Sequence, residues 1–182
     1  MHGEAGEHIA SNPPYGYIKD PENKKKWIVN EESVKVVRRS FDLCIAGKGP
    51  MQIAKILTAD KVLTVTAYNA RQKGWAMPDN LYQWCAKSVA GILERQEYTG
   101  CTVNFKTYTK SLKFKKRMEN PKENQRVFED TQSAIIERGQ WERVQALRAN
   151  KRRPTKTGKT SIFSGLVYCA DCGAKLYYCT CN

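Results

Sequence analysis

Hydrophobic residues recur every three to four positions in four stretches of the chain, which is the spacing of helices with one buried face. The clearest predicted helix starts after Asn30, a residue that can cap it, and stops before Gly47. A second starts at Pro50, a third begins between 81 and 85, and a fourth covers about 138–149. The residues expected on their buried faces are Val34, Val37, Phe41, Cys44, Ile45, Ile53, Ala54, Ile56, Leu57, Cys85, Val89, Ile92, Leu93, Gln96, Trp141, Val144 and Leu147 or Arg148.

Short β-prone segments predict strands between these helices. Tyr15–Ile18 and Trp27–Val29 read as a hairpin, because the polar residues of 19–26 cannot easily continue a strand. In 101–105 apolar and polar residues alternate, which predicts a strand with its apolar residues on the buried face. The lysine-rich segment 106–122 has little hydrophobic pattern and is predicted to be a basic loop.

The first two predicted helices are joined by the short turn 47–50. A helix, a short glycine turn and a helix form the skeleton of a helix-turn-helix-like unit, although ordinary helical hairpins share it. A polar stretch, 64–80, is expected to separate this pair from the third helix. The fold class that follows is α+β, mainly helical, with a helix-turn-helix-like core and short β-hairpins.

Composition excludes several classes of protein. No apolar run approaches the roughly 20 residues that a membrane helix needs, so no membrane partner is expected. The chain has only two histidines, His2 and His8, in a segment (1–10) expected to be an added or disordered N-terminus. The body of the chain therefore cannot supply a histidine base or a metal site with two histidines.

Positive charge is concentrated in the second part of the chain. The net charge is +13, and residues 1–102 hold 14 basic and 11 acidic side chains, a net of +3. Residues 103–182 hold 17 basic and 7 acidic ones, a net of +10. This asymmetry predicts a polyanionic partner, most simply nucleic acid, with a merely solvated basic face as the alternative.

Two segments are candidates for contact with DNA. The third helix has an exposed side with Lys87, Ser88 and Arg95, where basic and small residues can approach phosphates or base edges, although Glu94 favours a solvated face. The segment 151–160 has no acidic residue and is expected to be a mobile linker that follows the duplex. The full set of DNA-binding candidates is Arg71, Lys73, Lys87, Ser88, Arg95, Lys106, Lys110, Lys151, Arg152, Arg153, Lys156 and Lys159.

The candidates divide by chemistry. Arg152 and Arg153 suit base contacts or a narrow minor groove, because the guanidinium fork donates two hydrogen bonds. Four lysines are better suited to neutralising phosphates, which carries little sequence information. These four are Lys106, Lys110, Lys156 and Lys159.

Cysteines crowd into the last 14 residues. Cys169 and Cys172 have the Cys-x-x-Cys-Gly spacing with which a tight turn chelates zinc. A closed site needs four ligands, which Cys179 and Cys181 could complete; a ribbon cut short before its second pair, without zinc, is the alternative. Disulfides are less expected without a secretion signal. Cys44, Cys85 and Cys101 are expected to be structural core residues.

A series of short motifs then points to one family. They are Asn12–Tyr17; Val36–Arg39 followed by Phe41 and Gly47; Ile53–Ala54 with Leu57; Trp84 with Ser88–Val89 and Ile92–Leu93; Tyr98–Gly100; Ala134–Ile136 with Trp141; and Phe163–Leu166 with Cys169 and Cys172. In their order and spacing, over roughly 11–176, the chain resembles the large serine recombinases of phage integrases and transposon resolvases.

This resemblance implies a recombinase domain over 11–150, a basic linker over 151–162 and the beginning of a zinc ribbon over 163–182. It also implies a bacterial, cytoplasmic, nucleoid-associated protein with a separate serine catalytic domain, which is a dimer on DNA and a tetramer in synapsis. No serine of this chain lies in the motif of that catalytic domain, so we expect a monomeric DNA-binding fragment without cleavage activity. The alternatives are a stand-alone helix-turn-helix transcription regulator and a protein-interaction adaptor.

Overall fold

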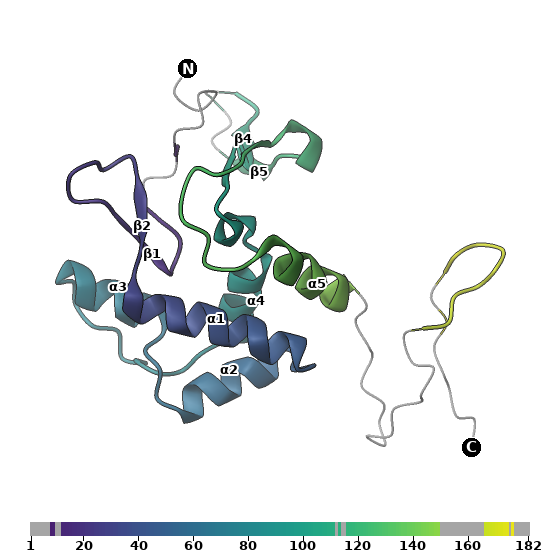
Figure 1. The fold of residues 1–182 in the computed structure, drawn as a ribbon, viewed down its shortest axis with the longest axis horizontal. Coiled ribbons are helices and arrows are strands. Elements are labelled where there is room, and N and C mark those ends of the chain that lie inside the picture. Colours follow the sequence, from purple (N-terminus) through teal and green to yellow (C-terminus); the bar gives the residue numbers. More distant parts are fainter. Residues whose placement is uncertain are drawn as a thin grey trace.

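The computed structural model describes residues 8–9, 12–111, 113, 116–149, 166–174 and 176. Within them, five α-helices accompany three antiparallel pairs of short strands (Figure 1). The helices are α1 (Glu31–Ile45), α2 (Pro50–Ala59), α3 (Val65–Lys73), α4 (Ala86–Glu94) and α5 (Arg138–Ala149). The strand pairs are β1 (Tyr17–Lys19) with β2 (Trp27–Val29), β3 (Thr102–Asn104) with β6 (Arg126–Phe128), and β4 (Thr107–Thr109) with β5 (Arg117–Glu119); two 3₁₀ turns are η2 (Gln96–Thr99) and η3 (Lys122–Asn124). The predicted α+β, mainly helical fold is confirmed.

Helix α1 begins as its sequence predicts. The Asn30 side chain accepts hydrogen bonds from the backbone N–H groups of Glu32, at 3.2 Å, and Ser33, at 3.0 Å. The hydroxyl of Tyr68 on α3 also donates to Asn30 Oδ1, at 2.7 Å. One asparagine therefore caps α1 and ties it to α3.

The polar stretch expected over 64–80 is wrong in its first half, where the chain forms α3. Thr64 caps this helix by accepting from the N–H of Ala67 at 3.3 Å, and Gly74 ends it in the left-handed conformation with φ of +66°. The buried residues of α3 are Ala67, Tyr68 and Ala70. Because two of them are alanines, the helix has almost no contrast between its apolar and polar faces, and periodicity does not reveal it.

Helix α4 is the central element of the helical part, because it packs closely on α2 and also against α1 and α5. Val89, Ile92 and Leu93 face this core and are buried, as predicted. Cys85 is exposed, contrary to the prediction, because it occupies the N-cap position and precedes the first buried turn. Cys44 and Cys101 are buried, and burial raises the pKa of both thiols.

Three of the sequence motifs meet around the buried Tyr98. Its hydroxyl donates to the carbonyl of Tyr15 at 2.7 Å, and its carbonyl accepts from the N–H groups of Ile135 and Ile136, at 2.8 and 3.0 Å. A Cβ at Gly16 would lie only 3.0 Å from Ile135 Cδ1, and φ there is +105°. The close approach and the backbone angle both require glycine.

Strand β3 buries its polar side chains, whereas the prediction placed its apolar side chains on the buried face. Thr102 and Asn104 are buried, whereas Val103 is half-buried and faces outward with Val127 of β6 as its partner in register. Polar residues can face inward here because their hydrogen bonds are satisfied, as with Thr102 Oγ1 at 2.6 Å from Thr131 Oγ1. The alternation ends at Phe105, which has a positive φ of +58°.

The segment predicted to be a basic loop over 106–122 contains the hairpin β4–β5, with Tyr108 opposite Met118. Strand β4 is exposed along its length, so no hydrophobic alternation marks it in the sequence. The side chain of Asn120 closes the hairpin base by donating to the carbonyl of Phe105 at 2.9 Å. The hairpin therefore depends on backbone pairing and polar contacts instead of a buried face.

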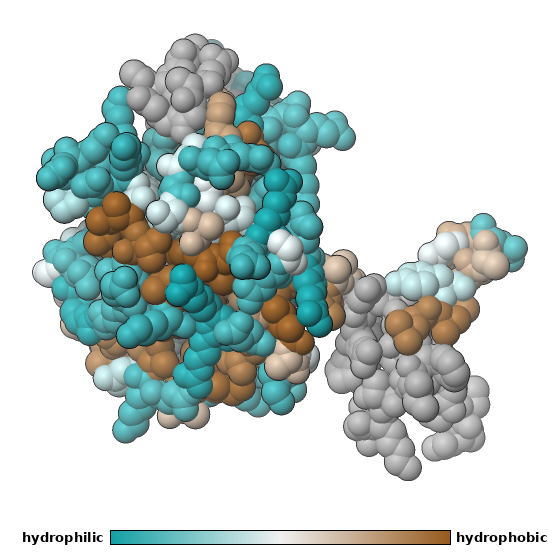
Figure 2. Space-filling view, in the orientation of Figure 1, coloured by the Kyte–Doolittle hydropathy of each residue, from teal (hydrophilic) through white to brown (hydrophobic). Residues whose placement is uncertain are grey.

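Helix α5 buries Val144 fully and Trp141 in part, as predicted. The sequence predicts either Leu147 or Arg148 on the buried face of the next turn. Arg148 takes this place, with a side chain only 15% exposed, whereas Leu147 is exposed. Figure 2 shows a largely hydrophilic face, with hydrophobic residues gathered near β1 and β2. In the described part of the chain, no helix is long and apolar enough to cross a membrane.

Candidate nucleic-acid interface

The outer face of α4 carries Lys87 and Ser88, both exposed, and leads to the exposed Arg95 directly after the helix. The start of the helix is held firmly, because Trp84 Nε1 donates to the carbonyl of Val62 at 2.9 Å. The backbone N–H of Trp84 also donates to Thr58 Oγ1 at 3.0 Å. The face is therefore a rigid platform whose buried side packs on α2.

Gly91 lies in the middle of this face without a packing reason to be glycine. A Cβ built on it would meet nothing within 4 Å. Glycine inside a helix costs about 1 kcal/mol relative to alanine. A bare backbone at this position lets another molecule approach α4 closely, which is what a helix entering a groove needs.

The acidic residue on this face is neutralised. Glu94 Oε1 lies 2.7 Å from Arg148 Nη2 of α5, and Gln145 Nε2 of the same helix donates to the carbonyl of Leu93 at 2.7 Å. These contacts hold α5 against the C-terminal end of α4. The negative charge of Glu94, which favours a solvated face in the sequence alone, thus has a cationic partner.

Ser88 has a partner within the same turn. Its Oγ lies 3.2 Å from Cys85 Sγ, and hydrogen bonding to Ser88 lowers the pKa of that exposed thiol. The hydroxyl is nevertheless exposed with its residue, so it can also exchange hydrogen bonds with a molecule docked on α4.

Arg71 and Lys73 lie on the last turn of α3 and are both engaged by the protein. Arg71 forms an ion pair with Glu32 of α1 and lies 5.4 Å from the centre of the Tyr68 ring; the hydrogen bond to Glu32 raises its pKa. Lys73 Nζ donates to Asn12 Oδ1 at 3.1 Å and lies 4.5 Å from the centre of the exposed Trp75 ring.

Lys106 and Lys110 frame β4 and differ in environment. Lys106 Nζ pairs with Glu97 Oε1, whose side chain is only 7% exposed. Lys110 is exposed at the far end of the strand, and the exposed Lys113 and Lys116 lie in the same connection between β4 and β5. The end of the hairpin is therefore the more available cationic surface, because the charge of Lys106 is already balanced.

The Recombinase protein family matches residues 31–151, which is two thirds of the chain. The chain belongs to the Recombinase family. The matched segment of this recombinase runs from the first residue of α1 to just beyond α5, so it includes the α4 face and the β4–β5 hairpin.

Two solved structures match this recombinase chain over 93% of its length. The protein in "Crystal Structure of a LSR-DNA Complex" is 18% identical with a TM-score of 0.47, and 44% of its length is covered. The protein in "Sequence Requirements of the Listeria innocua prophage attP site" is 20% identical with a TM-score of 0.43, and 58% of its length is covered. The chain thus spans about half the length of the solved chains it matches.

The Cys-x-x-Cys turn of this recombinase chain adopts a knuckle. The N–H of Cys169 donates to the carbonyl of Ala174 at 2.8 Å, and the N–H of Gly173 donates back to the carbonyl of Cys169 at 3.0 Å. Hydrogen bonds from the backbone of Cys172 and Asp171 lower the pKa of the Cys169 thiol and so favour the thiolate that binds metal. This donor set fits half of a zinc site.

Some predicted site residues fall outside the described residues. These are Lys151, Arg152, Arg153, Lys156 and Lys159 of the linker and Cys179 and Cys181 of the second cysteine pair. Among the described residues, no group of three or more potential metal ligands comes together. The linker contacts and the complete zinc site therefore stay predictions.

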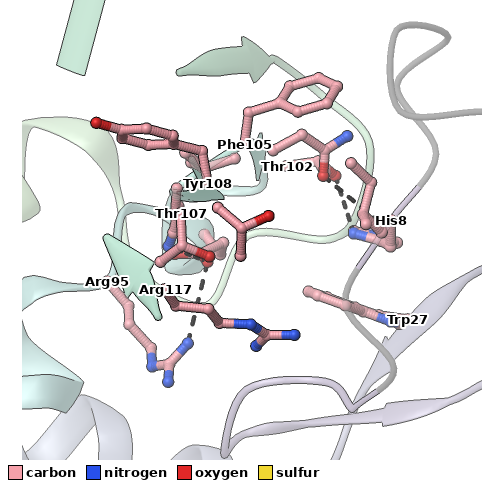
Figure 3. Close-up of a pocket in the computed structure, with 14 residues that line it drawn as sticks. His8, Trp27, Arg95, Thr102, Phe105, Thr107, Tyr108 and Arg117 are labelled. Atoms are coloured by element: carbon pink, nitrogen blue, oxygen red, sulfur yellow. Dashed lines mark hydrogen bonds and ion pairs between the residues drawn. The ribbon is translucent and has the colours of Figure 1, made fainter. Parts of the chain in front are cut away.

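The structure also brings together residues that the sequence did not mark as functional. His8, Trp27, Glu97 and Arg117 line a cleft of about 580 Å³ beside the base of the β4–β5 hairpin (Figure 3). These residues come from segments far apart in the sequence, so no local sequence motif predicts the cleft. His8 and Ile9, the described residues of the segment 1–10, contact the folded part of the recombinase chain.

Proposed function

We propose that this chain is the DNA-binding part of a large serine site-specific recombinase and recognises one half of a recombination attachment site. The observation that carries the proposal is the match of residues 31–151 to the Recombinase family. In this proposal a serine catalytic domain elsewhere in the protein cleaves and exchanges the strands. The present chain supplies affinity and register on double-stranded DNA, and the family match does not favour the alternative of a stand-alone regulator.

The outer face of α4 is the proposed reading surface. Lys87 lies on the first turn of α4 and Arg95 directly follows the last residue of the helix, so we propose that both reach one stretch of duplex. The guanidinium of Arg95 can donate two hydrogen bonds to a guanine in the major groove, whereas the ammonium of Lys87 suits a phosphate. Gly91 between them has an unobstructed backbone, which supports close approach.

The remaining cationic groups are proposed to hold the duplex without reading it. Lys110 at the end of β4 and Lys73 on α3 offer positive charge to phosphates, whereas the charge of Arg71 is already balanced by Glu32. Arg152 and Arg153 of the linker are proposed to enter a minor groove, where guanidinium groups are attracted by the strong negative potential. The net charge of +10 over 103–182 supports this division.

Zinc is the second part of the proposal. Cys169 and Cys172 would hold the ion from the knuckle, with Cys179 and Cys181 as the other two thiolates. When bound, the ion supplies structural cross-linking and no chemistry on DNA. The lowered pKa of Cys169 supports the assignment, because the thiolate is the ligating form.

Selection from a pool of randomised duplexes tests the DNA-binding function without knowledge of the target. The full chain is expected to enrich one related set of sequences. Arg95→Ala should relax the preference at one position and cost about 1–3 kcal/mol of affinity for the enriched duplex. Arg39→Ala is the matched control, because Arg39 is equally exposed but pairs with Asp60 away from the α4 face.

Each outcome of the selection has a clear meaning. Enrichment that is lost or broadened in Arg95→Ala and kept in Arg39→Ala supports the reading role of α4. If both variants retain the enrichment in full, α4 is not the surface that reads the DNA sequence. No enrichment by the folded parent chain would overturn the proposed function.

A further inference from the structure

The cleft beside the β4–β5 hairpin has the size and lining of a small-molecule site. Its volume of about 580 Å³ lies within the range of ligand pockets. Trp27 of β2 lies on one side and Arg117 of β5 extends across the cleft toward it, while Arg95 lies at the opposite end (Figure 3). The walls thus combine an aromatic surface with two guanidinium groups.

A planar nitrogen heterocycle already occupies the aromatic wall. The imidazole of His8 is stacked on Trp27 with 3.5 Å between ring centres and 7° between ring planes. Its Nδ1 lies 3.2 Å from the hydroxyl of Thr102. Burial lowers the pKa of His8, although Glu97 opposes the shift, which favours the neutral imidazole. A neutral, hydrogen-bonded heterocycle stacked on an indole is what a nucleobase presents.

A buried carboxylate in the same cleft has one oxygen without a donor. Glu97 is only 6% exposed. Its Oε1 accepts a hydrogen bond from Lys106 Nζ and lies 4.0 Å from Arg95 Nη1. Its Oε2 is buried and has no hydrogen-bond partner among the described residues. An unsatisfied buried acceptor is costly, so a ligand that brings an N–H group to this oxygen gains affinity.

Arg117 provides the charge that an anionic ligand needs. It forms no ion pair with the described residues, unlike Arg95 and Lys106, which share Glu97. Its position on the exposed strand β5 leaves the guanidinium free to donate two hydrogen bonds to a phosphate. Aromatic stacking, an acceptor for an amine and a donor for phosphate are the three features that recognise a nucleotide.

We propose that this cleft binds an unpaired nucleotide, with the base stacked on Trp27 in place of His8, its exocyclic amine on Glu97 and its phosphate on Arg117. Adenine, cytosine and guanine carry such an amine and thymine does not, so the site discriminates against thymine. His8 competes for the same aromatic surface in the absence of ligand. The ligand is either a free nucleotide or an unpaired base within a DNA strand, which share this chemistry.

Calorimetric titration of the full chain with dAMP, dCMP and dTMP tests the site directly. The parent chain is expected to bind dAMP and dCMP more tightly than dTMP. His8→Ala should tighten dAMP binding about fivefold or more, because stacking on Trp27 no longer has to displace the imidazole. Trp27→Phe keeps an aromatic wall and should retain weaker binding, which guards against a variant that fails to fold.

Two further variants separate the contributions. Arg117→Ala should weaken dAMP roughly tenfold but leave deoxyadenosine, which has no phosphate, unchanged. Arg126→Ala is the matched control, because Arg126 is an exposed arginine of β6 outside the cleft lining, and it should change neither. Glu97→Gln should reduce the preference for dCMP over dTMP. Nucleotide binding that survives Arg117→Ala and Glu97→Gln unaltered overturns the proposal.

A pair of duplexes distinguishes the two sources of ligand. One is fully paired and the other carries a single bulged adenine in the same sequence. Tighter binding of the bulged duplex, lost in Arg117→Ala, assigns the site to a DNA strand; equal binding of both duplexes with retained dAMP binding assigns it to a free nucleotide. If neither dAMP nor the bulge binds, even to His8→Ala, the cleft serves only the chain's own N-terminal segment and the proposal is wrong. Binding of the paired duplex does not depend on this result.

Discussion

At the scale of single residues, buried tyrosine hydroxyls tie the N-terminal hairpin to the helical core. Tyr98 donates to the carbonyl of Tyr15 at 2.7 Å, and Tyr17 donates to the carbonyl of Ser133 at 2.8 Å. Burial raises the pKa of Tyr15, Tyr17 and Tyr98 above the ordinary tyrosine value of 10.0. The folded state therefore holds these hydroxyls in their protonated form.

This predicts a loss of stability in alkali. Because the three pKa values are raised on folding, their contribution is complete below pH 10 and is lost as the pH rises above the unfolded value. Urea unfolding between pH 8 and 10.5 should show a falling free energy, and Tyr98→Phe should show a shallower fall. At pH 7 that variant should lose about 1 kcal/mol with its hydrogen bond. Tyr108→Phe, at an exposed position, is the control; an identical pH dependence in Tyr98→Phe and the parent chain would contradict the prediction.

Gly91 gives a second test at this scale. Gly91→Ala should raise the free energy of unfolding by up to about 1 kcal/mol, since alanine favours the helix and nothing obstructs its Cβ. The same change should weaken duplex binding if α4 lies against DNA. Gly139→Ala on α5 is the matched control, because its Cβ is also unobstructed, and it should leave binding unchanged. If Gly91→Ala stabilises the protein without any loss of duplex binding, Gly91 is not needed for close approach of DNA to α4.

At the scale of elements, the sequence predicts those that bury a continuous apolar stripe. Helices α1, α2, α4 and α5 follow from their patterns, because each carries at least one fully buried apolar residue on its stripe: Phe41, Leu57, Leu93 and Val144 in turn. The β1–β2 hairpin likewise buries Tyr17 and Trp27. Helix α3 buries small alanines, and β4 buries nothing, so neither leaves a periodic signal. The cleft residues Trp27 and Glu97 lie far apart in the sequence, so the sequence does not predict that they line one cleft.

The β4–β5 hairpin should act as a phosphate clamp. Replacing Lys110, Lys113 and Lys116 together by glutamine should reduce the magnitude of the salt slope of duplex binding by about 2.7, as expected for three phosphates. The matched control replaces the exposed Lys35, Lys48 and Lys55, which lie on or beside α1 and α2. If both triple variants shift the slope equally, the hairpin has no special role in binding.

The Cys169 knuckle should retain zinc. Metal analysis of the purified full chain is expected to give about one zinc per chain. Cys169→Ser and Cys172→Ser should each lose it, whereas Cys85→Ser, which removes an exposed cysteine elsewhere, should not. A metal-free parent chain would contradict the zinc assignment.

At the scale of the whole molecule, the structure distinguishes exposed cations in the second part of the chain from cations that are paired with carboxylates. The exposed Lys110, Lys113 and Lys116 lie at the end of the β4–β5 hairpin, while Lys106, Arg138 and Arg148 are balanced by carboxylates. From the charge and the family resemblance, the sequence predicts DNA as the partner. It could not predict which cations are already paired, because Glu97, Glu129 and Glu94 meet them only after folding.

The salt dependence of duplex binding tests the account most directly. The affinity of the full chain for its selected duplex and for an unrelated duplex is measured by titration at several salt concentrations. We expect log K to fall with log salt with a slope of roughly −5 for about six neutralised phosphates. At physiological salt the selected duplex should bind about a thousandfold or more tightly than the unrelated one. A slope near zero, together with equal affinity for the two duplexes, would contradict the assignment of this chain as the DNA-binding part of a recombinase.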